Sequence, residues 1–310
     1  MKRTIFCFIT CTITVVSACW SMPEPSRGSE KVVAGNPSPA SKASPSAEIT
    51  QIPSSNSNMS DNSSGDVFYK SLPSGFQAPT DDAGKLLLRE YGAVFVARGG
   101  AVPPKRVVYK DEAEVKAFQE TLQSVVETIG SYKVVLQAPA MTALKSAIAQ
   151  AKAAGKNITP RGADSARRGY TETVSLWKSR VDPGFVHWVG VGKVTGSEAA
   201  RIKALSPYEQ VPEILKLEKQ GIYFAKDLSK SIIYSVAPPG TSQHLSMLAL
   251  DVQQNDDPQV REILAKNGWY QTVTSDLPHF TFLGVPESEL PSLGLKKKQS
   301  AGRTFWVPDI

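Results

Sequence analysis

The chain has 310 residues, of which 41% are hydrophobic and 21% charged, a composition typical of a folded protein with a sizeable core. The formal net charge is +6, and the only lysine triplet, at residues 296–298, is typical of a solvated surface and does not make a nucleic-acid site. The three cysteines, Cys7, Cys11 and Cys19, all lie near the N-terminus, which excludes an internal disulfide and a cysteine-ligated metal in the folded part.

Residues 1–18 have the pattern of a signal peptide. A basic region at residues 1–3 precedes an uncharged apolar run at 4–16 that is too short for a comfortable bilayer span. Residues 16–19, Val-Ser-Ala-Cys, resemble a bacterial lipobox, in which the cysteine is acylated after cleavage. We expect a periplasmic lipoprotein held to the membrane only through Cys19. The outer membrane is favoured because Trp20 is no inner-membrane retention signal; ordinary cleavage near Cys19 is the alternative.

A tether is expected to follow the anchor. Residues 20–65 contain 13 Ser and 6 Pro, and Trp20 is their only aromatic residue, so they cannot bury enough apolar surface to fold. We assign 19–74 to the lipidated N-terminus and a disordered tether, and 75–310 to one domain. If residues 20–65 are a flexible chain, their root-mean-square reach is roughly 35–40 Å, enough to let an anchored domain search the nearby cell wall. A passive spacer is the alternative.

Helices and strands are expected to follow one another in the domain without regular alternation, which predicts an α+β fold with a mainly antiparallel sheet and flanking helices. His187 lies on an alternating apolar segment and is interpreted as a packed strand residue, not as a metal ligand. In chain order the patterns predict a strand at 93–96, a helix at 112–129, strands at 132–136 and 157–159, helices at 141–154 and 208–220, a strand at 231–236, and a helix at 258–266 before a turn at 268–270.

Two of the three histidines and two aspartates predict a metal site. His244, Asp251 and His279 supply the three nitrogen and oxygen ligands that a zinc hydrolase uses, and Asp276 is left for proton transfer. Residues 248–252 and 279–283 alternate as strands, so two neighbouring strands would present Asp251 and His279 to one pocket. His244 is expected in the loop opened by Pro-Pro-Gly at 238–240.

The same region resembles a known enzyme family. Residues 242–251 read Ser-x-His-x-x-Met-x-Ala-x-Asp, similar to the Ser-x-His-x-x-Gly-x-Ala-x-Asp signature of the VanY-type D-alanyl-D-alanine carboxypeptidases, which is followed by Glu-x-x-His. The resemblance implies a VanY/hedgehog-like zinc peptidase fold, with Zn²⁺ bound by His244, Asp251 and His279 and with Asp276 as the general base. It extends over residues 140–285.

An upstream block resembles the family's Tyr-Arg-Ser-x-x-x-Gln element, whose arginine receives substrate. The corresponding residues here are Arg168-Gly169-Tyr170-x-x-Thr173. Arg168 is the candidate for binding a substrate carboxylate, because a guanidinium suits bidentate recognition. Ser242 and Arg161 are further substrate-binding candidates, and Arg167 is a weaker one.

The chain departs from the family pattern at several positions. Met247 replaces the motif glycine, and Gly169 and Thr173 replace the upstream serine and glutamine. Asp276 replaces glutamate and is shorter by one methylene, on the order of 1 Å, a displacement that can cost roughly a hundredfold in rate. We expect zinc binding to survive these changes and the rate to be sensitive to the last one.

The resemblance implies a carboxypeptidase that trims the D-alanyl-D-alanine end of peptidoglycan stem peptides. Three alternatives remain open: an endopeptidase with the same zinc site, a catalytically weakened wall-binding lipoprotein, and a serine-type penicillin-binding enzyme. The last is suggested by Ser175-x-x-Lys178, although the companion Ser-Asp-Asn and Lys-Thr-Gly elements are absent from the sequence.

Overall fold

The structure, a computed structural model, describes residues 63–310, which belong to one compact unit. The predicted signal peptide, Cys19 and the tether up to residue 62 lie outside the described residues. The end of the predicted tether is helical, since α1 spans Ser63–Ser71 and buries Phe68 completely. The folded part therefore begins before residue 75. Within residues 63–310, no helix has both the length and the apolar character needed to cross a bilayer.

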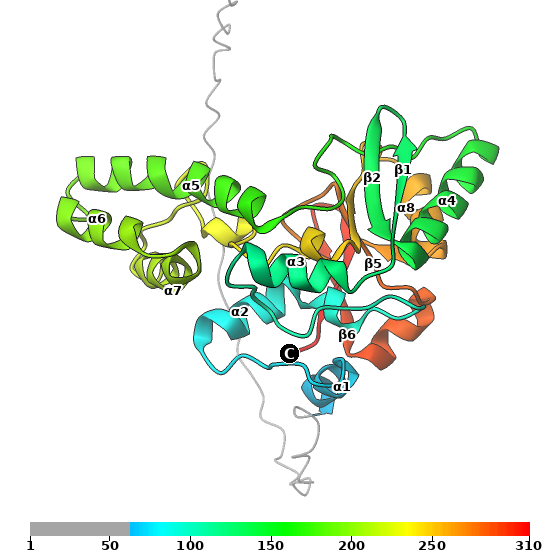
Figure 1. Ribbon diagram of the computed structural model, residues 1–310, viewed down its shortest axis with the longest axis horizontal. Helices are drawn as coiled ribbons and strands as arrows, with labels where there is room; N and C mark the ends of the chain where they lie inside the picture. Colours follow the sequence, from blue (N-terminus) through cyan, green and yellow to red (C-terminus); the bar gives the residue numbers. More distant parts are fainter. Residues whose placement is uncertain (1–62) are drawn as a thin grey trace, which may run out of the picture. The chain divides into compact units, whose positions relative to one another are not determined.

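The described part of the chain is α+β, and its strands form three small antiparallel sheets (Figure 1). The single mainly antiparallel sheet expected from the sequence is thus divided. One hairpin pairs β1 (Ser124–Ile129) with β2 (Tyr132–Gln137), another pairs β6 (Leu295–Ser300) with β7 (Arg303–Pro308), and a third sheet has the order β3-β5-β4, formed by Ala249–Asp251, His279–Phe282 and Trp269–Tyr270.

The helices form two groups around these sheets. Helices α4 and α8 pack against each other, α4 also against β2 and α8 against β4, whereas α5, α6 and α7 pack in succession on the other side of the view in Figure 1. The bounds are α2 Asp82–Tyr91, η1 Gly92–Val96, α3 Glu112–Glu120, α4 Ala138–Ala153, α5 Tyr170–Gly190, α6 Gly196–Ala204, α7 Pro207–Glu218, η2 Ile232–Tyr234, η3 Gln243–Ser246, α8 Pro258–Lys266 and η4 Glu287–Leu293, where η marks a 3-10 helix.

Several predicted elements are confirmed. Helices α4, α7 and α8 and strands β2, β3 and β5 lie where the sequence patterns place them, within a few residues at each end. Residues 157–159 do not form the predicted strand, and only the next residue, Pro160, makes an isolated antiparallel bridge, to Val252.

Four other predicted elements are wrong, and the first two lie before residue 130. Residues 93–96 lie in the 3-10 helix η1 (Gly92–Val96), whose five residues are all buried. Their continuous apolar run lacks the alternation that would distinguish a strand from a buried helix. The predicted helix 112–129 ends at Glu120, because the β-branched residues of 124–129 pair as β1 with β2 across a tight turn at Gly130.

Within residues 231–236 the short 3-10 helix η2 forms instead of the predicted strand, and a buried carboxylate favours it. Glu218 accepts hydrogen bonds from the backbone N–H groups of Ile232 (2.7 Å) and Phe224 (3.1 Å), and from the Ser231 hydroxyl. Burial raises the pKa of Glu218, while these donors oppose the shift. The Ile232 N–H is therefore satisfied by a side chain and not by a neighbouring strand.

Helix α5 also differs from expectation. The sequence predicts a strand around His187, but Trp177, Val181 and Phe185 recur every four residues and are buried along one helical face. Phe185 packs edge-on against Phe224, with ring centroids 5.0 Å apart. His187 lies on the exposed side of α5.

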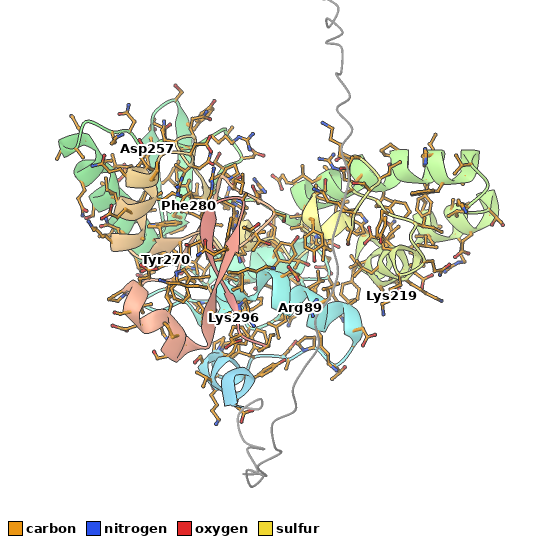
Figure 2. All side chains as sticks on the ribbon, turned by 180° about the vertical axis from the view of Figure 1, so that it is seen from behind. Arg89, Lys219, Asp257, Tyr270, Phe280 and Lys296 are labelled. Carbon is orange, nitrogen blue, oxygen red and sulfur yellow. The ribbon has the colours of Figure 1, made fainter. Side chains whose placement is uncertain are left out.

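The β3-β5-β4 sheet separates the core from the polar side chains of the candidate site. Leu250 on β3 and Phe280 and Phe282 on β5 are at most 4% exposed and belong to the hydrophobic core. Figure 2, a view from behind, labels Phe280 on β5 and Tyr270 on β4. Because side chains alternate along a strand, Asp251 and His279 project to the opposite face.

The loop that leads into η3 depends on Gly240. This residue has φ +75°, its carbonyl accepts from the Tyr109 N–H at 3.0 Å, and a Cβ at this position would overlap the Tyr109 carbonyl. Gly155 has a similar φ of +69°, but a Cβ added there would meet no neighbouring atom within 4 Å. Alanine substitutions at the two glycines therefore distinguish the cost of backbone strain, which both share, from the cost of steric overlap, which only Gly240 has.

We predict that Gly240→Ala lowers the free energy of unfolding by at least about 2 kcal/mol more than Gly155→Ala, whose cost is the left-handed strain of about 1–2 kcal/mol. Urea unfolding followed by circular dichroism measures both. Equal losses for the two variants would show that the Tyr109 contact does not constrain the loop.

Candidate metal centre

Antiparallel pairing places two of the predicted ligands opposite each other. Asp251 at the end of β3 is the direct partner of His279 at the start of β5. The other edge of β3 is also held, because the Asp251 N–H donates to the Ser165 carbonyl at 2.8 Å and the Arg161 N–H donates to the Asp251 carbonyl at 3.0 Å. The prediction that two neighbouring strands present Asp251 and His279 to one pocket is confirmed.

The third ligand candidate reaches the same point from a tight turn. His244 lies in η3, and the residue that ends this turn, Met247, has the left-handed conformation φ 55°, ψ 29°. Glycine adopts this conformation without strain, whereas residues with a side chain adopt it rarely. Met247 keeps the conformation while burying its side chain, which is 1% exposed.

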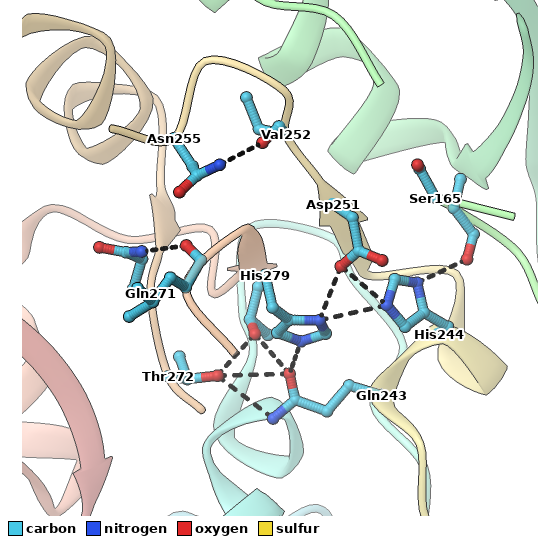
Figure 3. A network of polar contacts seen from close by, with 12 residues as sticks. Ser165, Gln243, His244, Asp251, Val252, Asn255, Gln271, Thr272 and His279 are labelled. Atoms are coloured by element: carbon cyan, nitrogen blue, oxygen red, sulfur yellow. Dashed lines mark hydrogen bonds and ion pairs between the residues drawn. The ribbon is translucent and has the colours of Figure 1, made fainter. Parts of the chain in front are cut away.

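The three candidate ligand atoms form a nearly equilateral triangle. His244 Nε2 lies 3.1 Å from His279 Nδ1, and each nitrogen lies 3.3 Å from Asp251 Oδ1 (Figure 3). Zinc bonds of about 2.0–2.1 Å in a tetrahedron imply ligand separations of about 3.3 Å. The triangle therefore has the dimensions of one face of a tetrahedral site, and this buried group could hold a metal ion.

Hydrogen bonds on the outer side of both rings fix which nitrogen faces inward. His244 Nδ1 donates to the Ala166 carbonyl at 2.7 Å, and His279 Nε2 donates to Gln243 Oε1 at 2.8 Å. The Gln243 amide is oriented by its own Nε2, which donates to the Tyr91 carbonyl at 2.9 Å. With the outer nitrogens protonated, both neutral rings turn lone pairs toward Asp251, an arrangement that a cation satisfies.

The electrostatic environment favours neutral histidine beside an ionised aspartate. Burial lowers the pKa of the His244 imidazole, and Asp251 opposes that shift. Burial raises the pKa of Asp251, but its interactions with His244 and His279 outweigh burial and hold this pKa well below the ordinary value. Neutral imidazole and carboxylate are the protonation states that bind metal.

Arg168 contacts the ligand group directly. Its Nη2 lies 2.7 Å from Asp251 Oδ2, its Nε donates to the Asp164 carbonyl at 2.9 Å, and the Asp164 carboxylate lies 3.8 Å away. The guanidinium thus holds the Asp251 oxygen that faces away from the histidines. The sequence predicted Arg168 near the site but not this ion pair.

A cavity of about 480 Å³ opens beside the three ligand candidates, and Arg161, Arg168, Ser242 and Asp276 also line it. Asp276 is partly exposed there, Ser242 is buried and Arg161 is exposed. Arg167 does not line the cavity. The lining comprises Tyr91, Arg161, Gly162, Asp164, Ser165, Arg168, Thr173, Leu176, Arg180, Ile233, Tyr234, Ser235, Val236, Ala237, Ser242, Gln243, His244, Asp251, Val273, Ser275, Asp276 and His279.

Sequence reasoning missed three residues of this site. Gln243 occupies a variable position of the motif, and only its place next to His244 could have drawn attention to it. Tyr91 and Arg180 come from α2 and α5, and no local pattern marks them. Ser175 and Lys178, which suggested the serine-type alternative, are exposed on α5 and do not line this cavity.

Comparisons with protein families, curated proteins and solved structures give no match for this chain.

We predict that Gln243→Leu raises the zinc dissociation constant by about 10–100-fold, because His279 loses the acceptor that fixes its tautomer. Gln243→Glu keeps an acceptor and is expected to retain the affinity. A competition titration with a chromophoric chelator measures it. Gln210→Leu is the matched control, since Gln210 is a buried glutamine that bonds Trp177, Lys203 and Leu205 instead. An equal effect in both variants would contradict the assigned role.

Proposed function

We propose that this protein is an exported, zinc-dependent hydrolase of the VanY type that removes the terminal D-alanine from peptidoglycan stem peptides. The observation that carries the proposal is the buried triangle of His244, Asp251 and His279, whose sides of 3.1–3.3 Å suit tetrahedral zinc. The resemblance of residues 242–251 and 276–279 to the VanY motifs supplies the substrate class.

The residues around the triangle fit the parts that such a reaction requires. When bound, zinc would polarise the scissile carbonyl and activate water as the nucleophile. Asp276 lies on the wall of the same cavity, and no side chain or backbone group of residues 63–310 donates a hydrogen bond to its carboxylate. Asp276 is thus the general base in this proposal: it takes the proton of the attacking water and returns it to the departing amine.

The other residues hold this arrangement in place. Gln243 and the Ala166 carbonyl keep the histidine rings in one tautomer, and Arg168 holds Asp251. The ion pair with Asp251 changes the role proposed for Arg168, which here positions a metal ligand. Ser242 and Arg161 remain candidates for substrate contact from the cavity wall.

Export and anchoring are proposed from the sequence of residues 1–19. The signal peptide and Cys19 support a periplasmic, lipid-anchored location, with the outer membrane favoured. This location agrees with a substrate in the cell wall, and the proposal includes neither nucleic acid nor any other membrane contact.

We predict that Asp276→Asn lowers kcat for D-alanine release by about 10²–10⁴-fold while zinc content stays at the wild-type level, because only proton transfer is removed. Asp276→Glu, which restores the longer side chain of the family, is expected to raise kcat. D-alanine release from a stem peptide, together with metal analysis, measures both effects. Asp164→Asn makes the same chemical change in the same cavity and is expected to have a much smaller effect.

Further outcomes separate the alternatives. Cleavage of cross-linked muropeptides without D-alanine release would indicate an endopeptidase, and stoichiometric zinc without turnover on any stem peptide would indicate a wall-binding protein. Loss of activity with a chelator but not with a β-lactam would reject the serine-type enzyme. An Asp276→Asn variant as active as wild type would rule out Asp276 as the base.

A further inference from the structure

The charged residues of the cavity are unequally paired. Its lining contains three arginines and three aspartates, namely Arg161, Arg168, Arg180, Asp164, Asp251 and Asp276. Among these residues, Arg168 forms two ion pairs, one with Asp164 and one with Asp251. Among residues 63–310, neither Arg161 nor Arg180 forms an ion pair, and a divalent cation would leave the lining with two positive charges in excess. The metal-loaded cavity is therefore suited to an anionic substrate.

Arg168 is poorly available for that anion. Its guanidinium already binds Asp251 Oδ2 at 2.7 Å and the Asp164 carbonyl at 2.9 Å. Moving it toward a substrate would leave a largely buried carboxylate with one fewer partner, which is costly. A second guanidinium is needed if a substrate carboxylate is to be bound without disturbing the ligand group.

Arg180 has the position and the orientation for this task. It is partly buried on the face of α5 that also brings Thr173 and Leu176 to the cavity, at the three- and four-residue spacing of one helical face. Its Nε donates to Ser235 Oγ at 3.0 Å, and its Nη1 donates to Ser179 Oγ at 2.9 Å. Both partners are neutral, so they orient the guanidinium without neutralising its charge.

The remaining donors of Arg180 are free for a ligand. Within the described residues Nη2 makes no hydrogen bond, and Nη1 has one further N–H whose only acceptor is the Ser179 carbonyl at 3.5 Å. Nη1 and Nη2 together present the planar edge that binds a carboxylate through two parallel hydrogen bonds. Arg161 is exposed, and within the described residues its side chain makes no hydrogen bond, so it lacks this preorganisation.

We infer that Arg180 binds the terminal carboxylate of the peptide substrate and so makes this cavity specific for free peptide C-termini. The inference rests on the proposed function for its substrate class. From the sequence, Arg168 was the residue expected to bind the substrate carboxylate. Helix α5 would then carry the specificity, while the β3–β5 strand pair and η3 carry the metal ligands.

The test compares two peptides that differ in one charge. Diacetyl-L-lysyl-D-alanyl-D-alanine has a terminal carboxylate as its only charge, and its C-terminal amide has none. Binding of both is measured by calorimetry on the metal-free full-length protein, and kcat and KM are measured on the zinc-loaded protein. The variants are Arg180→Ala, Arg180→Lys, Arg161→Ala and the control Lys178→Ala, which removes a positive charge from an exposed position of the same helix.

We predict that Arg180→Ala weakens binding of the peptide acid and raises its KM by about 10–100-fold, as expected for charge-assisted hydrogen bonds. The amide should bind weakly to the wild type and lose nothing further in the variant. Arg180→Lys should retain part of the preference for the acid, because it keeps the charge but not the planar fork. Lys178→Ala should behave as wild type, and unchanged zinc content shows that the variants are folded.

Several results would overturn the inference. These are equal binding of acid and amide by the wild type, an equal loss for both peptides in Arg180→Ala, or a preference for the acid that only Arg161→Ala removes. If the wild type releases no D-alanine but prefers the acid, and Arg180→Ala abolishes that preference, the carboxylate site stands and the hydrolase proposal fails. The two proposals can therefore fail separately.

Discussion

The convergence of three buried lone-pair donors on one point is the constraint on which the rest of the site depends. His244 Nε2, His279 Nδ1 and Asp251 Oδ1 lie 3.1–3.3 Å apart. One proton on either of the two inner nitrogens would not satisfy all three atoms. Buried polar atoms that face one another without a shared partner are costly. A bound cation would remove that cost, and the group could hold a metal ion.

The surrounding structure keeps these atoms together. Asp251 and His279 are held by strand pairing, and the left-handed turn at Met247 holds η3 against the same strands. Each histidine ring is fixed from behind by a carbonyl oxygen, one from the backbone of Ala166 and one from Gln243. The geometry is therefore preorganised by the backbone and by neutral hydrogen bonds, as a site of defined ligand geometry requires.

The part of the site on adjacent strands could be predicted from the sequence, because residue alternation in 248–252 and 279–283 decides which side chains share a face. The confirmed helices α4, α7 and α8 likewise have clear periodicity or caps. Two of the failures come from distant residues, which local patterns cannot show. Glu218 takes the Ile232 N–H that a strand would have used, and Arg180 reaches the cavity from a helix that sequence patterns did not connect to it.

The central claim is that His244, Asp251 and His279 bind one zinc ion, and X-ray absorption spectroscopy of the zinc-loaded protein tests it most directly. The account predicts one zinc per chain, with two imidazole nitrogens and one carboxylate oxygen at about 2.0–2.2 Å, and loss of this signal in His244→Ala. Zinc that binds substoichiometrically, or with a ligand set unchanged in His244→Ala, would contradict it.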